Sequence, residues 1–272
     1  MQSIAEQSRA ELGGQLSVLH RQRRDHVRLG GYLEELGRTP APEQGPILLA
    51  IYRLVFPHAF AEEAVLWPVM RRVLPDGHEL TLRVEREHQA INELVRRLQD
   101  LPSGAADREL LLLQTTGLLV EDVRDEEDLL LPRLQAALTP LQLKLVGIAW
   151  EIVRRIAPTR PHPIVSRRPP GNVLSALPLS FLDRSRDRLE AMSFRSRSKA
   201  LASILQQADS ALTVASHGVE RLPGMKAGED PQTRLPNERG SVLKRALLIA
   251  LAGAGLSYLV WQNQRRGRAS IA

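Results

Sequence analysis

The sequence contains no cysteine, and aromatic residues make up only 4% of its 272 residues. A chain without cysteine forms no disulfide bonds and offers neither thiolate ligands for a metal nor a cysteine nucleophile. Any metal ion must therefore be held by nitrogen and oxygen atoms. The first 24 residues are polar and lack the apolar stretch of a secretory signal peptide, so we expect no such signal at this end.

Positive and negative charges are divided unequally between the two halves of the chain. Residues 1–150 hold 17 lysines and arginines against 22 acidic residues, a net charge of −5, whereas residues 151–272 hold 20 against 9, a net charge of +11. The hydrophobic content of 43% is enough for a globular core and excludes a wholly disordered chain. An acidic half with most of the histidines thus precedes a basic half.

Apolar residues recur every three or four positions from the start to about Leu138, which is the period of amphipathic helices and not of strands. Helix breakers at 39–42, 75–77 and 101–104 divide this region into four helices. Thr139 and Pro140 suit the start of a fifth helix. Because short connections make long helices antiparallel neighbours, the sequence predicts an all-α fold with an up-down four-helix bundle over 1–138 and an appended helix over 139–157.

The basic half is predicted to be only partly helical. Its predicted parts are a Pro/Arg-rich linker over 158–180, an amphipathic helical region over 181–222, a flexible linker over 223–241 and a hydrophobic helix over 242–263.

The first half also contains an internal repeat. Residues 58–68 match residues 122–132 at an offset of 64, sharing a Glu-Glu pair, an apolar pair and a proline, and residues 24–26 match residues 86–88 at an offset of 62. The bundle is therefore interpreted as a duplicated helical hairpin.

Polar residues interrupt the apolar stripe of all four predicted helices at corresponding positions. They are His26 in the first helix, His58 and Glu62 in the second, His88 in the third, and Asp122 and Glu126 in the fourth. Residues four apart share a helix face, so each pair points into the core, while Glu63 and Glu127 are expected to turn toward the rim. Buried carboxylates repel one another unless a cation lies among them, and a metal pair supplies one. The remaining histidines are expected at the surface or in loops: His20, His78, His162 and His217.

The motifs that carry this pattern are Asp25-His26, His58-x-x-x-Glu62-Glu63 before Pro68, Glu87-His88, and Glu126-Glu127 before Pro132. On these motifs the region from about Ser8 to Leu138 resembles the hemerythrin-like HHE cation-binding domain family. The resemblance implies a non-haem di-iron centre with the ligands His26, His58, Glu62, His88 and Glu126, the two glutamates being candidate bridges; manganese is the alternative metal.

One position departs from the family pattern. The family has histidine where this sequence has Asp122, which we include among the candidate ligands. A carboxylate makes the site harder and favours the higher oxidation state. This suits iron storage, sensing or oxidation better than reversible oxygen carriage; a degenerate site with weak metal binding is the alternative.

The apolar run from Ala246 to Trp261 contains no charged residue. Extended to Val242 it reaches the length of a membrane span, with basic residues on both sides, and its small residues suit a homodimer of such helices. We therefore expect a membrane-anchored protein with the bundle on the cytoplasmic side, the basic region being attracted to lipid. A cytoplasmic soluble protein in which this helix packs on the bundle is the alternative. Nucleic acid is not expected as a partner, because the arginines are scattered and few aromatic residues accompany them.

The function predicted from these observations is a membrane-tethered module that senses or stores iron, or responds to oxygen, nitric oxide or redox state. A di-iron oxidase-like enzyme and a degenerate bundle acting as a scaffold are the alternatives. The sequence carries no further acid-base or cofactor motif, which argues against the enzyme.

Overall fold

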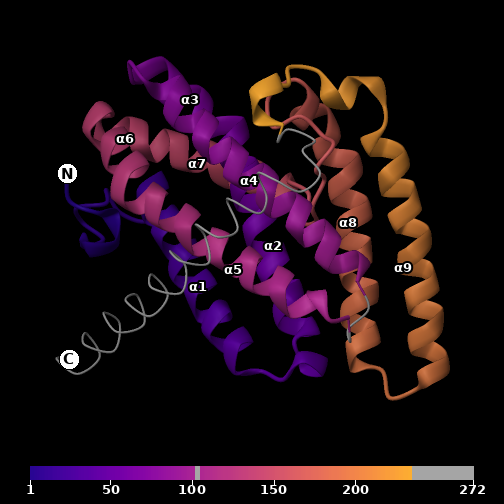
Figure 1. Ribbon diagram of the computed structural model, residues 1–272. Coiled ribbons are helices and arrows are strands. Elements are labelled where there is room, and N and C mark those ends of the chain that lie inside the picture. Colours follow the sequence, from indigo (N-terminus) through magenta and orange to yellow (C-terminus); the bar gives the residue numbers. More distant parts are fainter. Residues whose placement is uncertain (102–104, 235–272) are drawn as a thin grey trace.

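The computed structural model describes residues 1–101 and 105–234, and within these ranges the regular structure is helical, without strands. Four long helical segments form the bundle of the first 138 residues (Figure 1). Their helices are α1 (Val18–Arg38), α2 (Gly45–Ala61) with α3 (Trp67–Val73), α4 (Gly77–Asp100), and α5 (Asp107–Asp125) with α6 (Leu131–Ala137). These correspond to the four helices that the apolar period predicts.

Two π-helical turns interrupt the second and fourth segments at equivalent places. The turn η3 (Glu62–Leu66) joins α2 to α3, and η4 (Glu126–Leu130) joins α5 to α6. Pro68 and Pro132 follow these turns, and a proline ring clashes with the carbonyl four residues earlier in a regular α-helix. One extra residue in the turn relieves that clash without ending the helix. The repeat seen in the sequence therefore extends to the backbone.

The two largest hydrophobic clusters of the bundle lie one on each side of a polar band. Along α1, Leu19 belongs to the first cluster and Leu29 to the second, and His26 lies between them. The same order holds in α4, where Val84 and Ile91 belong to different clusters. The polar residues predicted in mid-helix thus lie between two apolar regions and away from both ends of the bundle.

The appended helix α7 (Pro140–Ile156) covers one side of the bundle. It begins with a capping box, in which the Thr139 side chain accepts a hydrogen bond from the Gln142 N–H while the Gln142 side chain accepts from that of Thr139. Its Trp150 is fully buried against α1 and α2. At Gly147 a side chain would meet the Leu16 carbonyl oxygen at 2.1 Å, so only glycine permits this close approach of helix and chain.

The C-terminal half contains more ordered helix than the sequence predicts. The helices α8 (Gly171–Arg195) and α9 (Lys199–Glu220) form a hairpin that packs beside α2 (Figure 1). The linker expected over 158–180 therefore ends ten residues early, and Pro178 lies within α8 on its exposed face.

The next segment also differs from the prediction of a flexible linker over 223–241. Its described part contains the short 3₁₀ turns η5 (Pro223–Lys226) and η6 (Pro231–Thr233). The backbone N–H of Ser166 donates to the Met225 carbonyl at 2.8 Å, and that of Gly171 donates to the Ala227 carbonyl at 2.9 Å. Residues 223–234 are thus fixed against the loop that precedes α8.

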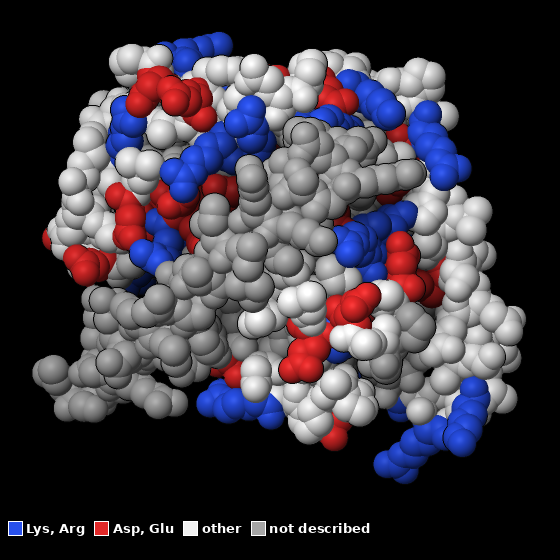
Figure 2. All heavy atoms as spheres, viewed as in Figure 1, with Lys and Arg blue, Asp and Glu red and all other residues white. Residues whose placement is uncertain are grey.

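Many charges of the basic half are paired inside the molecule. Arg168 binds Glu85 of the acidic half at 2.7 Å and Asp230 at 2.8 Å, while Arg167 lies 3.6 Å from Glu63. On the face shown in Figure 2, basic and acidic residues are accordingly interspersed and not separated into two regions. Part of the +11 charge therefore holds the C-terminal half against the bundle.

The hydrophobic helix predicted over 242–263 lies outside the described residues. Among the helices that are described, none combines the length and apolar character that a membrane crossing requires.

Candidate metal centre

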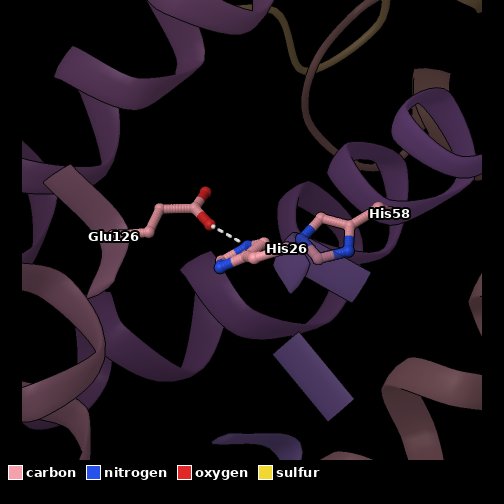
Figure 3. Close-up of side chains that lie close together, drawn as sticks. All are labelled: His26, His58 and Glu126. Carbon is pink, nitrogen blue, oxygen red and sulfur yellow. Dashed lines mark ion pairs between the residues drawn. The ribbon is translucent and has the colours of Figure 1, made fainter. Parts of the chain in front are cut away.

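The polar band between the two apolar clusters brings together side chains from all four bundle segments. His26 Nε2 of α1 lies 3.1 Å from Glu126 Oε2 of η4, and Figure 3 shows the His58 imidazole beside this pair. His58 Nε2 lies 3.0 Å from Glu62 Oε1, and His88 Nε2 lies 3.7 Å from Glu62 Oε2. All five side chains are buried.

These residues form two groups that share one carboxylate. His26, His58 and Glu126 each offer a ligand atom within 4.8 Å of the others, and so do Glu62, His88 and Glu126. The first group is richer in nitrogen and the second in oxygen. Glu126 belongs to both groups, so it would be the shared ligand if each group held an ion.

Several polar atoms in this band are buried without a hydrogen bond. They are His58 Nε2, both carboxylate oxygens of Glu62, His88 Nε2, Asp122 Oδ1 and Glu126 Oε1. A buried polar group without a partner costs about 1–3 kcal/mol, and more when it is charged. Such a set, made of imidazole nitrogens and carboxylate oxygens, fits a pair of metal cations.

Each histidine is also held by a carboxylate on its other ring nitrogen. The Nδ1 contacts are His26 with Glu127 at 3.0 Å, His88 with Glu63 at 3.0 Å, and His58 with Asp25 at 3.5 Å. Contacts of this kind fix the orientation of a metal-binding imidazole and raise its basicity. The Nε2 atoms are thereby directed toward the centre of the band.

Glu63 and Glu127 are more buried than their expected position at the rim implies. Glu63 is only 1% exposed, and Glu127 is half-buried. The wide π turn places two successive glutamates on the inner side of the helix, where a regular α-helix would separate them by about 100°. The Glu-Glu doublet before a proline was the sequence signal for this arrangement.

Asp122 is also brought into the band, with Oδ1 3.4 Å from His88 Nε2. It occupies the place that His58 occupies in the other half of the repeat, just as Glu87 corresponds to Asp25. Asp25 contacts the imidazole of His58, whereas Glu87 faces the carboxylate of Asp122. Burial and the charges of Asp122 and Asp125 accordingly raise the pKa of Glu87 to about 7.

The electrostatics of the metal-free band show how strongly it requires positive charge. Burial, with the charges of Glu62 and Asp122, raises the pKa of Glu126 to about 8. Burial opposes protonation of His58, but the charge of Glu62 and the hydrogen bond to Asp25 raise its pKa to about 9. Protonated histidines therefore neutralise the buried carboxylates when no metal does so.

The helix α7 contributes residues to the outer side of the band. The Trp150 ring meets the His58 imidazole edge-on, with centroids 5.1 Å apart, and Arg154 lies 3.7 Å from Asp25. The Arg154 guanidinium, with the hydrogen bond to His58, holds the pKa of Asp25 below its usual range although burial acts to raise it. The fifth helix is therefore part of the surroundings of the candidate ligands.

Among the histidines expected at the surface or in loops, His162 differs from the others in being buried. It lies in the loop before α8 but is buried, with Nδ1 2.6 Å from Glu220 and Nε2 2.9 Å from Asp183. His20 and His217 are half-buried and His78 is exposed.

Comparison with known proteins agrees with this geometry. Residues 16–134 match the family model described as the hemerythrin HHE cation binding domain. The match covers less than half of the chain, and we call the matched residues the HHE domain. An uncharacterized hemerythrin-like protein of Schizosaccharomyces pombe is 24% identical over 134 residues, which cover 49% of this chain and 66% of that protein, just under two thirds of its length. No solved structure matches the chain. The HHE domain ends before α7, so the fifth helix and the α8–α9 hairpin lie beyond the matched residues.

Proposed function

We propose that the HHE domain binds a pair of non-haem iron ions and serves as a sensing or reservoir module. The metal ligands in this proposal are His26, His58, Glu62, His88, Asp122 and Glu126. The observation that supports it is the convergence of buried imidazole nitrogens and carboxylate oxygens, most of them without a hydrogen bond, into two groups joined at Glu126. A bound iron pair would supply a change of oxidation state and an open position for a diatomic ligand such as oxygen or nitric oxide.

A small cavity near the proposed ligands suits a diatomic ligand. A cavity of about 30 Å³ lies between the HHE domain and the loop before α8, lined by Glu63, Asn92 and Arg167 among others. This volume accommodates one or two water-sized molecules. A diatomic ligand fits a space of this size, and the cavity adjoins the site through Glu63, which contacts His88.

Membrane tethering through residues 242–263 is a separate part of the proposal. It is supported by the charge-free apolar run and by the basic residues on both sides of it. In this arrangement the HHE domain lies on the cytoplasmic side of the membrane.

Iron binding is tested by reconstituting the purified protein with ferrous iron without oxygen and measuring the bound metal. We expect close to two irons per chain and a new absorption band on exposure to air. The Glu126→Gln variant should lose both ions because both groups contain Glu126, whereas Glu109→Gln, an exposed change in α5 of the same segment, should keep them. A wild-type protein that stays colourless and metal-free would exclude the proposal, and retention of two irons by Glu126→Gln would exclude the shared ligand.

Tethering is tested separately by washing membranes of the native host with alkaline carbonate. The full chain should stay in the membrane fraction. Release into the soluble fraction would exclude a spanning segment and leave iron binding unaffected.

A further inference from the structure

The turn between α8 and α9 exposes large apolar side chains at one end of the molecule. Met192 is 53% exposed and Phe194 44% on α8, and Leu201 is 47% and Ile204 61% on α9. Single exposed apolar residues are common on protein surfaces, but a group of four at one hairpin end marks a contact surface. We call residues 188–204 the hairpin tip.

The same tip carries unpaired positive charge. Arg188, Arg195, Arg197 and Lys199 are exposed, and none of them has an ion-pair partner among the described residues. The acidic residue of the tip, Glu190, is already bound by the buried Arg160 at 2.5 Å. The tip therefore presents cations without competing carboxylates, unlike the paired arginines of the preceding loop.

The tip is held in a fixed position and is not a loose projection. The Phe194 ring lies against Gly45 at the start of α2, where a side chain would approach it to 2.8 Å. Ser198 caps α9 by accepting a hydrogen bond from the Leu201 N–H. In the adjoining connection between α1 and α2, Glu43 is an exposed acid, and Arg38, the last residue of α1, is an exposed cation.

We propose that the hairpin tip docks on a lipid surface that carries anionic headgroups. Interleaved aliphatic and basic side chains are the combination that inserts into the headgroup boundary and attracts acidic lipid. A nucleic acid would favour aromatic residues for stacking, and the four exposed apolar residues include only Phe194, whose ring is partly occupied by Gly45. The inference shares a membrane partner with the proposed tether, but it stands on residues 188–204 alone.

Because the chain has no cysteine, a single introduced cysteine reports on one position. The probe is Ala200→Cys in the full chain, labelled with an environment-sensitive fluorophore and mixed with vesicles of phosphatidylcholine alone or with 30% phosphatidylserine. The control is Ala211→Cys, which lies on the same face of α9 but about 16 Å further along its axis. We expect a blue shift at position 200 with phosphatidylserine vesicles, a smaller shift at 211, and loss of the effect at high salt.

A charge-reversal variant tests the cations directly. Arg195→Glu, Arg197→Glu and Lys199→Glu together should weaken binding to phosphatidylserine vesicles by more than roughly 100-fold, since loss of three basic residues at about 1 kcal/mol each already gives that factor and the new acids add repulsion. The matched control reverses Arg72, Arg97 and Arg221, which are exposed elsewhere, and should lower binding far less. Circular dichroism is used to check that both variants fold. The salt dependence of the wild-type shift is a separate test that needs neither variant.

Any of the following results would contradict the inference. Sedimentation with vesicles without a shift at position 200 would show that another segment alone binds lipid. An equal shift with both vesicle types would exclude a role for the cations. A shift that grows with protein concentration without vesicles would identify a second copy as the occupant, and the same shift with RNA or DNA would identify nucleic acid. None of these results depends on whether the HHE domain holds iron.

Discussion

Replacement of His162 by glutamine should remove a pH-dependent part of the folding stability. The imidazole lies between Asp183 of α8 and Glu220 of α9, and a hydrogen bond to both carboxylates requires that both ring nitrogens carry protons. Burial acts to lower the pKa of His162, but the charges and hydrogen bonds of Asp183 and Glu220 have the larger effect and raise that pKa to about 9. Arg96 contacts Glu220 at 3.7 Å and supplies a second, non-titrating cation.

The size of the effect follows from the raised pKa. A change from 6.5 in the unfolded chain to about 9 in the folded protein corresponds to about 3 kcal/mol of stability. Because the folded-state pKa is the higher one, this stability is complete below pH 6.5 and is lost as the pH rises through 9. His162→Gln should therefore be least stable relative to wild type at pH 6, and the difference should shrink by about 3 kcal/mol at pH 9.5.

The assay is urea unfolding of metal-free wild type and His162→Gln, followed by circular dichroism at pH 6 and pH 9.5. Replacement of the exposed His78 by glutamine serves as a control and should leave the free energy of unfolding unchanged at both pH values. Comparison with wild type cancels the contributions of the histidines in the metal centre, whose surroundings both proteins share. A difference that stays constant between the two pH values would show that His162 is neutral, and would refute the reasoning.

Three further predictions concern the metal centre. Glu63→Gln should weaken metal binding by roughly 10- to 100-fold without removing a ligand, because it loosens His88; calorimetric titration measures this, and unchanged affinity would contradict it. Asp122→His should alter the affinity and the absorption spectrum, with Glu87 available to bind the new imidazole; identical values in both proteins would show that Asp122 is not a ligand. Metal binding should release protons and weaken as the pH falls, because His58, with a pKa of about 9, must lose its proton. Titrations in buffers of different ionisation enthalpy detect that release, and equal heats in all buffers would rule it out.

The bundle and its candidate ligands could be predicted from the sequence because both depend on local patterns. Helical period, breakers and the repeat place His26 and His88 in mid-helix, and the structure brings each of them to Glu126 in the buried band. The π turns were not predicted, although Pro68 and Pro132 carry the signal. A proline clash inside a helix can be relieved by a kink, an end or a wider turn, and the packing of the bundle determines which occurs.

The C-terminal half was harder to predict because its order depends on contacts distant in sequence. The loop around His162 is fixed by Asp183, Glu220 and Asn92, whose side chain accepts a hydrogen bond from the His162 backbone N–H at 3.0 Å. These partners come from three different helices. Composition alone therefore indicates a linker where the folded chain has a buried ion cluster.

The carboxylates that hold the histidines connect the two halves of the repeat. Glu127 of the second hairpin holds His26 of the first, and Glu63 of the first holds His88 of the second. Neither hairpin supplies from its own side chains the carboxylate that holds its His26 or His88. The candidate metal site therefore lies at the interface between the two hairpins, which the three-residue connection 74–76 joins. Two hairpins expressed as separate chains would have to associate before either could bind metal, so metal affinity would report their dimerisation.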